Sequence, residues 1–416
     1  MEAERTRAAW VCCHLGARRN YGIARNLHSK GLLERLITDV WAKPGNPVGY
    51  LSRSVRRRYH PVLAVAPVHS ANLELLAFEI LARAMGWRGG VRIFRRNQWF
   101  QSHVVRTLRR LEREGRFSEH RNMSARRVLH GFSYTALHPF AFAKEHGWHT
   151  VLEQIDAGPL MQRIEDKLNA THLMEGGRSL ASPLAYWEEW RQQCMLADKI
   201  IVNSSWTRSA LLREGIADRK IRTIPLSYAP PQETMNYERT VPAAFSSKRP
   251  MRVLFLGQVT LLKGVMPLLE AIDLVRDVPI ELHVVGQVHF KVPAKFLKHP
   301  RIRWRGRAAR WAVAEYYQNS DVFAFPTFCD GFGLTQLEAQ AWGMPVIASK
   351  FCGDVVKDEV NGIRLSEVTA GAIATALLDL GRSPARLRRL AANSKVAPPF
   401  TAEAESDAFA QLFDEL

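Results

Sequence analysis

The sequence predicts an α/β protein built from parallel βαβ units in more than one domain. Three segments carry the strand–loop–helix–strand order of such a unit, at residues 8–41, 252–285 and 322–348. A stretch rich in Pro, Ser and other polar residues, 225–250, lies between the first unit and the other two, as a linker would. With 416 residues, the chain is long enough for two or three domains.

The N-terminal unit is expected to begin with a strand at Ala8–His14. A turn at residues 16–20 leads into a helix at 21–30. Gly31 ends that helix, because glycine tolerates the left-handed conformation of a helix C-terminus. The next strand is expected at Leu36–Trp41.

Residues 50–127 are harder to interpret. An amphipathic helix is expected at 72–85, because apolar residues recur there at helical spacing: Leu73, Leu76, Ala77, Ile80, Leu81 and Ala84. Residues 83–127 hold 13 Arg and only three acidic residues. Regular α/β order resumes afterwards, with strands expected at 128–129, 150–155 and 199–203 and a helix at 184–196.

The C-terminal half gives the clearest pattern. Strands are expected at 252–256, 280–285, 322–326 and 346–348, and helices at 265–275, 335–342 and 402–416. We therefore divide the chain into an N-terminal Rossmann-like domain (1–232), a linker (233–250), a C-terminal Rossmann-like domain (251–400) and a final helix (401–416).

The formal net charge of +18 is unevenly distributed. Residues 1–235 hold 36 Lys/Arg against 21 Asp/Glu, whereas residues 236–416 hold 22 against 19. Such an excess indicates that the N-terminal half meets an acidic partner, either nucleic acid, anionic lipid or a phosphorylated acceptor. We find no RNA- or DNA-binding motif, and aromatic residues interleave little with the arginines, so no nucleic acid is expected. We favour an anionic membrane surface, attracted by residues 83–127 with Arg53 and 56–58.

Hydropathy and cysteine content indicate a cytoplasmic protein. No run of about 18 apolar residues is present, so no transmembrane helix is expected. The apolar run at residues 8–13 is too short for a signal-peptide core. The five cysteines form no CxxC pair, and Cys12 and Cys13 are expected as buried thiols on a strand. The basic N-terminal half further predicts that the protein lies peripherally on the inner face of the membrane.

The strongest functional motif is the run from Asp330 to Glu338, between a strand and a helix. Open α/β sheets bind ligands at such strand-to-helix turns. Glycine lets backbone N–H groups approach phosphate oxygens, and Glu338 can accept hydrogen bonds from ribose hydroxyls. Asp330 is expected beside the ligand bound at this turn. The residues expected to bind that ligand are Gly331, Phe332, Gly333, Leu334, Thr335 and Glu338.

A second glycine-bearing turn, residues 257–264, also follows a strand and opens a helix. Its Lys263, between Gly257 and Gly264, can place a cation on a diphosphate as the sugar–phosphate bond breaks. An isolated lysine is usually only a surface residue, but the flanking glycines favour a site. We therefore expect Gly257 and Lys263 to bind the same ligand as the first turn, with Lys263, Asp330 and Glu338 as the catalytic residues.

These residues resemble the family 4 glycosyltransferases. The similarity includes Lys263-Gly264, Gly286 and the run from 321 through Asp330 and Glu338 to 346, with weaker matches at 361–362 and at 197–224. It implies the GT-B fold, with two facing Rossmann-like domains, the donor on the second and the acceptor on the first. It also implies retention of anomeric configuration without a metal, and the chain has no DxD motif.

The resemblance also assigns residues of the N-terminal half. Residues 16–20 match the family's first loop, so Gly16 is expected at the donor phosphate, with Arg18 either a site cation or a solvated charge. A His often ends the family's strand that matches residues 151–155. No His lies there in this chain, which leaves Glu153 or Asp156 to serve the donor or acceptor. In the C-terminal half, Asp330 stands where Glu is usual, and Gln258 where Arg is usual. Arg305 or Arg307 is the candidate replacement for that cation.

The expected function is transfer of a sugar from a sugar nucleotide to an acceptor hydroxyl, on a glycan or a lipid-linked sugar, with no cofactor and no metal. In such a retaining transfer the acceptor attacks from the face of the leaving diphosphate, which itself takes the proton. The alternatives are a sugar-nucleotide epimerase of the same fold, a non-catalytic member of the family and a basic nucleic-acid-binding protein.

Overall fold

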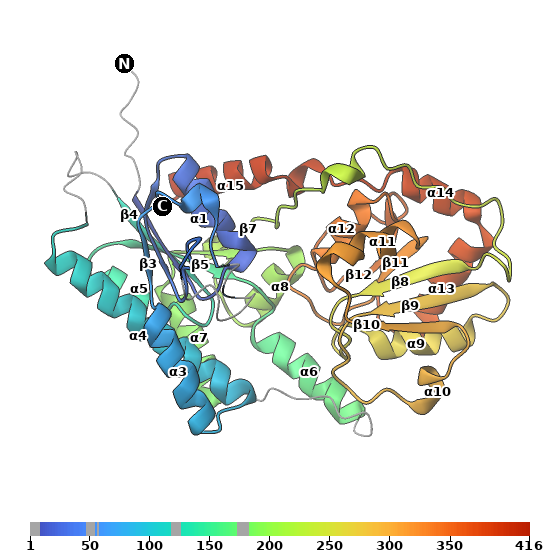
Figure 1. Ribbon diagram of the computed structural model, residues 1–416, viewed down its shortest axis with the longest axis horizontal. Coiled ribbons are helices and arrows are strands. Elements are labelled where there is room, and N and C mark those ends of the chain that lie inside the picture. The colour runs from blue at the N-terminus through green and yellow to red at the C-terminus, as the bar shows by residue number, and fades with distance from the viewer. Residues whose placement is uncertain (1–8, 47–54, 56–57, 118–125, 173–182) are drawn as a thin grey trace, which may run out of the picture.

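The computed structural model describes residues 9–46, 55, 58–117, 126–172 and 183–416. Figure 1 shows two α/β lobes side by side, one made mainly by the blue-to-green half of the chain and the other by the yellow-to-red half. Each lobe contains one parallel sheet, and separate apolar clusters pack on the two faces of that sheet. The prediction of an α/β protein with two Rossmann-like lobes is confirmed.

The N-terminal sheet has seven strands in the order β3-β2-β1-β4-β5-β6-β7. All of its neighbouring strands are parallel. The strands span Ala9–His14 (β1), Leu33–Thr38 (β2), Val68–Ser70 (β3), Arg127–Phe132 (β4), His149–Gln154 (β5), Lys199–Val202 (β6) and Ile221–Thr223 (β7).

Helices cover both faces of this sheet. One face packs against α4 (Gly89–Arg113), α5 (Leu137–Glu145) and α7 (Leu184–Leu196). The other face packs against α1 (Gly22–Ser29) and against the last helix of the chain, α15 (Ala402–Asp414), through Phe409 and Leu412. The C-terminal segment therefore crosses back to complete the N-terminal lobe (Figure 1). The remaining helices of this half are α3 (Asn72–Ala84), α6 (Pro159–Thr171) and α8 (Ser205–Arg213).

The C-terminal sheet has six strands in the order β10-β9-β8-β11-β12-β13, again all parallel. They span Met251–Leu256 (β8), Ile280–Val285 (β9), Ile302–Gly306 (β10), Val322–Phe325 (β11), Val346–Ser349 (β12) and Gly362–Leu365 (β13). The central strands are almost continuous apolar runs, as expected for strands covered on both faces. The helices are α9 (Val265–Leu274), α10 (Ala294–Leu297), α11 (Val313–Gln318), α12 (Thr335–Ala341), α13 (Ala370–Arg382) and α14 (Pro384–Ala392).

The strand order creates one switch point in each sheet. In the N-terminal sheet the chain moves outward from β1 to β3 and then returns beside β1 with β4. In the C-terminal sheet, β11 returns beside β8 in the same way. Loops at the carboxyl ends of the strands that flank a switch point diverge and leave a crevice, which is where such sheets bind ligands. The loops at these two points begin at residues 15, 133, 257 and 326.

One expectation for the N-terminal half is wrong in detail, and the stretch that was hard to interpret contains a long helix. The second strand is Leu33–Thr38 and not Leu36–Trp41, because the Asp39 carboxylate ends the ladder by accepting from loop amides. Val40 and Trp41 are apolar because they are buried beyond the strand. Part of the arginine-rich stretch is the 25-residue helix α4, which buries Phe100, Val104, Leu108 and Leu111 at helical spacing and turns most of its arginines outward.

The cysteine prediction is confirmed, since all five cysteines are free and buried. Burial raises the pKa of the Cys12 and Cys13 thiols, so both stay protonated at neutral pH. Within the part of the chain that the structure describes, no helix combines the length and apolarity that crossing a bilayer requires.

Candidate functional site

The two glycine-bearing turns of the C-terminal lobe meet at its switch point. Lys263, in the loop after β8, forms an ion pair with Asp330, in the loop after β11. The side chain of Lys263 is 25% exposed and that of Asp330 is 21% exposed, so the pair lines a surface and is not sealed in the core. The Lys263 ammonium also lies 5.6 Å from the centre of the Phe325 ring. The turns therefore converge as the sequence predicts.

Gly264 makes this convergence possible. It has a φ of +69°, and a Cβ at this position would lie only 1.7 Å from the carbonyl oxygen of Pro326 at the end of β11. Any other residue would push the Lys263 loop away from the Asp330 loop. Thr327 reinforces the contact by donating its hydroxyl to the carbonyl of Leu262 at 3.1 Å.

The segment from Gly331 to Thr335 follows the ion pair and leads into α12. The amide of Phe332 donates to Asp330 Oδ1 at 3.2 Å, while the Phe332 side chain packs in a buried apolar cluster. Phe332 therefore holds the turn from beneath. Leu334 packs partly against the same cluster, and Gly333 lies against the Phe325 ring.

Glu338 is half-buried on α12 and does not point into an apolar core. Its Oε2 accepts the hydroxyl of Tyr317, on α11, at 2.8 Å. Burial, followed by the Glu338 charge, raises the pKa of Tyr317 well above its usual value. Burial and the same carboxylate raise the pKa of Tyr228 to about 12. The Tyr317 hydroxyl thus fixes a carboxylate that keeps further lone pairs for ligand hydroxyls.

On the N-terminal lobe, Gly16 begins the loop at the carboxyl end of β1. Its φ is +87°, and its amide donates to Asp39 Oδ1 at 3.0 Å. Asp39 is fully buried and also accepts from the guanidinium groups of Arg58 at 3.4 Å and Arg96 at 3.0 Å. One carboxylate therefore anchors the Gly16 loop and two arginines together. Asp39 is not among the predicted site residues, because it falls inside the strand expected at Leu36–Trp41.

The rest of that loop is tightly folded. Arg19, Asn20 and Tyr21 all have positive φ values, between 51° and 59°. Arg18 lies over the Phe132 ring, with its guanidinium carbon 5.2 Å from the ring centre. Arg19 contacts Glu153 at 3.7 Å and also pairs with Glu405 of α15. Three consecutive non-glycine residues in a costly conformation indicate a loop that its surroundings hold in place.

Glu153 and Asp156, the candidates to replace the absent histidine, lie in different surroundings. Glu153 is buried in β5, 3.4 Å from His130. Burial alone would raise its pKa, but His130 and the nearby arginines lower the pKa below its usual value. Asp156 is partly exposed and accepts from Tyr134 at 2.5 Å and from the Gly158 amide at 2.9 Å. Burial raises its pKa despite these bonds. Of the two, Asp156 is the one open to a ligand.

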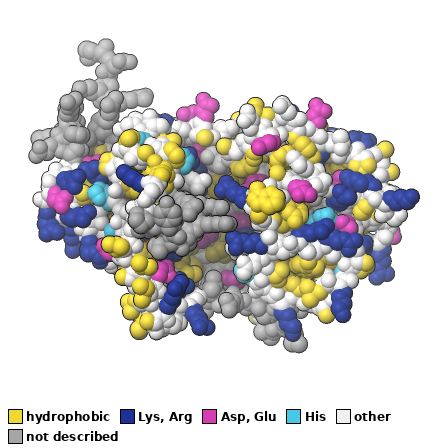
Figure 2. All heavy atoms as spheres, in the orientation of Figure 1, with side chains coloured by type: hydrophobic (Ala, Val, Ile, Leu, Met, Phe, Trp, Pro, Cys, Tyr) yellow, Lys and Arg dark blue, Asp and Glu magenta, His cyan; other side chains and the backbone are white. Residues whose placement is uncertain are grey.

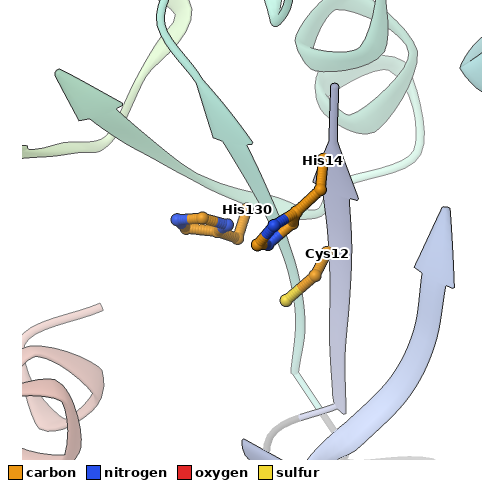
Figure 3. Close-up of side chains that lie close together, drawn as sticks. All are labelled: Cys12, His14 and His130. Carbon is orange, nitrogen blue, oxygen red and sulfur yellow. The ribbon is translucent and has the colours of Figure 1, made fainter. Parts of the chain in front are cut away.

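Cys12, His14 and His130 form a buried cluster, in which the candidate metal-binding atoms all lie within 4.8 Å of one another. Figure 3 shows the three side chains on the same side of the neighbouring strands β1 and β4. Burial, then His130 and the nearby arginines, lowers the pKa of His14 far below its usual value. An uncharged imidazole beside a protonated thiol can be buried without an ion. The expectation of no metal therefore stays a prediction, with this cluster as the place to test it.

The lobes touch through the Asp330 loop. Ser204, at the N-terminus of α8, donates its hydroxyl to the Gly331 carbonyl at 2.7 Å. A Cβ on Gly331 would lie 2.0 Å from the carbonyl oxygen of Ile155 in the opposite lobe. Asp354 of the C-terminal lobe accepts from the amide of Ser205 at 2.8 Å. The candidate donor turn therefore lies at the interface between the lobes, where closure excludes water.

Some predicted residues lie outside this group. Gly257 ends β8 and donates to the carbonyl of Val285, and Gln258 beside it is exposed. Arg305 is exposed and lines a pocket with Arg252, Glu281 and His283, away from the Lys263 turn. The proposed replacement of the missing cation by Arg305 therefore has no support in the contacts. Arg53, Arg56 and Arg57 lie outside the described residues.

Comparisons with known proteins agree with this architecture. Residues 250–383 match the model of the family described as glycosyl transferases group 1. A D-inositol 3-phosphate glycosyltransferase from Xylanimonas cellulosilytica is 32% identical over 162 residues, which are 35% of this chain and 37% of that protein. One from Streptomyces bingchenggensis is 28% identical over 47% of each chain. The aligned regions thus span less than half of these relatives' own length.

Solved structures cover almost the whole chain. HepE from Anabaena, in complex with UDP and glucose, aligns with 98% of this chain and 100% of its own at a TM-score of 0.59 and 14% identity. Sucrose-phosphate synthase from Thermosynechococcus elongatus aligns over 98% and 99% at a TM-score of 0.62 and 17% identity. The chain therefore has the GT-B fold, and its C-terminal domain belongs to the group 1 glycosyltransferases, as the resemblance to family 4 implied.

Proposed function

We propose that the protein transfers a sugar from a sugar nucleotide to an acceptor hydroxyl, with retention of configuration and without a metal. The observation that carries this proposal is the Lys263–Asp330 pair at the C-terminal switch point, beside a turn that touches the opposite lobe. Lys263 can neutralise a diphosphate there, while Asp330 lies ready for a sugar hydroxyl. Glu338, held by Tyr317, then accepts hydrogen bonds from the ribose.

In this mechanism the bond from the anomeric carbon to the diphosphate oxygen breaks first. The acceptor oxygen bonds to the same face of the sugar, and its proton passes to the leaving diphosphate. Lys263 stabilises the negative charge that grows on the diphosphate. It needs no rearrangement to do so, since its position is fixed in advance by Gly264 and Asp330. We expect the Gly16 loop, which Asp39 anchors, to contact the substrates from the acceptor lobe. Closure of the lobes brings the two substrates together and excludes water.

The relatives suggest which substrates to test first. Solved structures of the same fold contain UDP, UDP-glucose or glucose, and the two relatives described above are named D-inositol 3-phosphate glycosyltransferases. The basic N-terminal half favours an acceptor that carries negative charge or lies at an anionic membrane, such as a lipid-linked sugar or a polysaccharide under assembly. We place the protein in the cytoplasm, at the inner face of the membrane.

A thermal-shift screen of UDP-, GDP- and ADP-sugars tests donor binding. A ligand at 100 times its Kd should add about 2.7 kcal/mol of stability. The best donor is then incubated with sugar-phosphate and lipid-linked acceptors, and NMR of the product gives the anomeric configuration. Inverted product would contradict retention, and loss of transfer in EDTA that Mn²⁺ restores would contradict metal independence.

The epimerase of the same fold remains the second candidate, because the Lys263–Asp330 turn would hold a sugar nucleotide in either reaction. The donor is incubated without acceptor and its sugar is analysed by NMR. Formation of an epimerised sugar nucleotide would contradict the transfer proposal and support an epimerase. Binding without turnover across many acceptors would instead indicate a non-catalytic member.

A further inference from the structure

The outer side of α3 carries an apolar stripe that faces solvent. Leu73 is 77% exposed, Ile80 61%, Leu81 50% and Leu76 44%, and all four lie at helical spacing along one side. The opposite side buries Phe78 and Ala82. This amphipathic helix therefore turns a wide apolar side away from the protein core, whereas a surface helix ordinarily turns that side inward.

The exposed apolar surface continues at the tip of the α3–α4 pair, where Met85, Val91 and Ile93 are also exposed. Arginines surround the same tip, with Arg83 on α3 and Arg88, Arg92 and Arg95 at the start of α4, all exposed. Figure 2 shows the α3 side chains as a yellow strip at the lower left of the molecule, with dark blue Lys and Arg side chains on both sides of it. Single exposed leucines are ordinary, but a continuous apolar strip beside basic residues marks an interaction surface.

We propose that this surface, the apolar stripe of α3 with the arginine tip of α3 and α4, docks onto an anionic lipid bilayer. The stripe (Leu73, Leu76, Ile80 and Leu81) enters the boundary between headgroups and acyl chains, and the arginines contact the anionic headgroups. An interfacial helix has this composition, with aliphatic residues on one side and basic residues nearby. The inference deepens the membrane partner of the proposed function, since it assigns the contact to apolar insertion as well as to charge.

Charge favours an anionic bilayer over the main alternative partner of this surface, which is a second copy of the chain. Residues 1–235 carry 36 Lys/Arg against 21 Asp/Glu, and an isologous dimer through α3 would bring two of these basic halves together. An anionic bilayer instead offers negative charge and an apolar layer on the same surface. Some of the arginines are already partnered by acids of α3, such as Arg92 with Glu79 and Arg106 with Glu74. The positive charge of this surface is therefore partly neutralised. The apolar stripe then contributes a larger share of the binding free energy.

The test compares two triple variants of the whole protein. Leu73→Gln, Leu76→Gln and Ile80→Gln remove the stripe without changing charge, and glutamine is a good helix former. The matched control makes the same change to glutamine at three other exposed leucines, Leu212, Leu274 and Leu297, which lie on α8, α9 and α10. Co-sedimentation is measured with vesicles of phosphatidylglycerol and phosphatidylcholine and with phosphatidylcholine alone, at physiological salt.

The wild-type protein and the control are expected to sediment with the anionic vesicles, and the stripe variant is expected to bind at least tenfold more weakly. Hydrogen exchange of the wild type should show new protection at residues 72–95 when these vesicles are added, which tests the surface without any substitution. Equal vesicle binding by the stripe variant and the wild type, or no protection there, would overturn the proposal. So would a dimer that the stripe variant abolishes while its vesicle binding is unchanged.

Failure of this proposal is distinguishable from failure of the proposed function. Vesicle binding needs no donor, and the donor thermal shift needs no membrane. A stripe variant that keeps its donor shift but loses the vesicles supports docking alone. A wild-type protein that binds vesicles while no sugar nucleotide stabilises it would overturn the transferase proposal and leave the docking surface standing.

Discussion

Lys263 is the single side chain on which the proposed chemistry depends most. Lys263→Ala is expected to lower kcat by about 100- to 1,000-fold, because a preorganised cation at the diphosphate is lost. The fold should change little, since the Lys263–Asp330 pair is partly exposed and such pairs contribute at most about 1 kcal/mol. Lys295→Ala, which breaks the exposed pair with Asp273, is the matched control and should keep wild-type turnover. Unchanged turnover in both variants would remove Lys263 from the mechanism.

Asp156 allows a prediction from its raised pKa. Asn at this position keeps an oxygen for the Tyr134 and Gly158 donors but removes the charge that burial opposes. Burial raises the pKa of Asp156 in the folded protein above its unfolded value. Ionised Asp156 therefore lowers the free energy of unfolding as the pH rises through these two pKa values. At lower pH the Asp and Asn side chains are both uncharged. Asp156→Asn should therefore raise Tm at neutral pH and leave it unchanged in acid. A Tm lowered at neutral pH would mean that the carboxylate charge itself stabilises the fold, as a partner to Arg18.

At the residue scale, the sequence could indicate Lys263, Asp330 and Glu338 because glycines and strand ends mark them. Asp39 and Tyr317 carry no such local mark. Asp39 matters because the fold brings Gly16, Arg58 and Arg96 to it from distant parts of the chain. Tyr317 becomes visible only when α11 packs against α12. Contacts of this kind arise from tertiary structure, which residue spacing does not encode.

The turn at Gly331, between β11 and α12, controls how closely the lobes approach. Gly331→Ala would place a methyl group 2.0 Å from the carbonyl oxygen of Ile155, so closure should be blocked and transfer lost. Donor binding to the C-terminal lobe should weaken much less than kcat. Gly371→Ala is the control, because nothing lies within 4 Å of its Cβ position. Equal kcat in Gly331→Ala and wild type, measured with the donor found by thermal shift, would contradict a closed catalytic state with this contact.

At the element scale, buried parallel strands and their helices were the predictable part. Three bounds match the expectation residue for residue or nearly so, at Leu184–Leu196, Ile280–Val285 and Thr335–Ala341. Turn-forming residues at the ends explain this agreement in part, since Pro183, Pro279 and Gly286 flank the first two segments. The missed helix α4 has strong apolar periodicity, but its many arginines outnumber the apolar positions that face the core. The apolar stripe of α3 is also readable in the sequence, yet only the structure shows that it faces solvent.

At the scale of the whole molecule, α15 joins the two lobes, because it follows the C-terminal lobe and packs on the N-terminal sheet. Its buried Leu412 lies in the same apolar cluster as Leu27 of α1, and Glu405 pairs with Arg19 of the site loop. Leu412→Ala should therefore destabilise the N-terminal lobe by about 2–5 kcal/mol, the usual cost of such a cavity. Transfer should also fall, because the Gly16–Tyr21 loop loses support.

Hydrogen exchange distinguishes this account from a general loss of stability. In Leu412→Ala, protection should fall in α1 and at the ends of β1 and β5, while α9 and α13 of the C-terminal lobe keep wild-type protection. Gln411→Ala, at the exposed neighbouring position, should change neither lobe. A loss of protection confined to the C-terminal lobe would mean that α15 stabilises the lobe it follows in sequence. The site loop would then depend on its own turn geometry and on Asp39, and the lobes would be coupled through the contacts at Gly331 and Asp354.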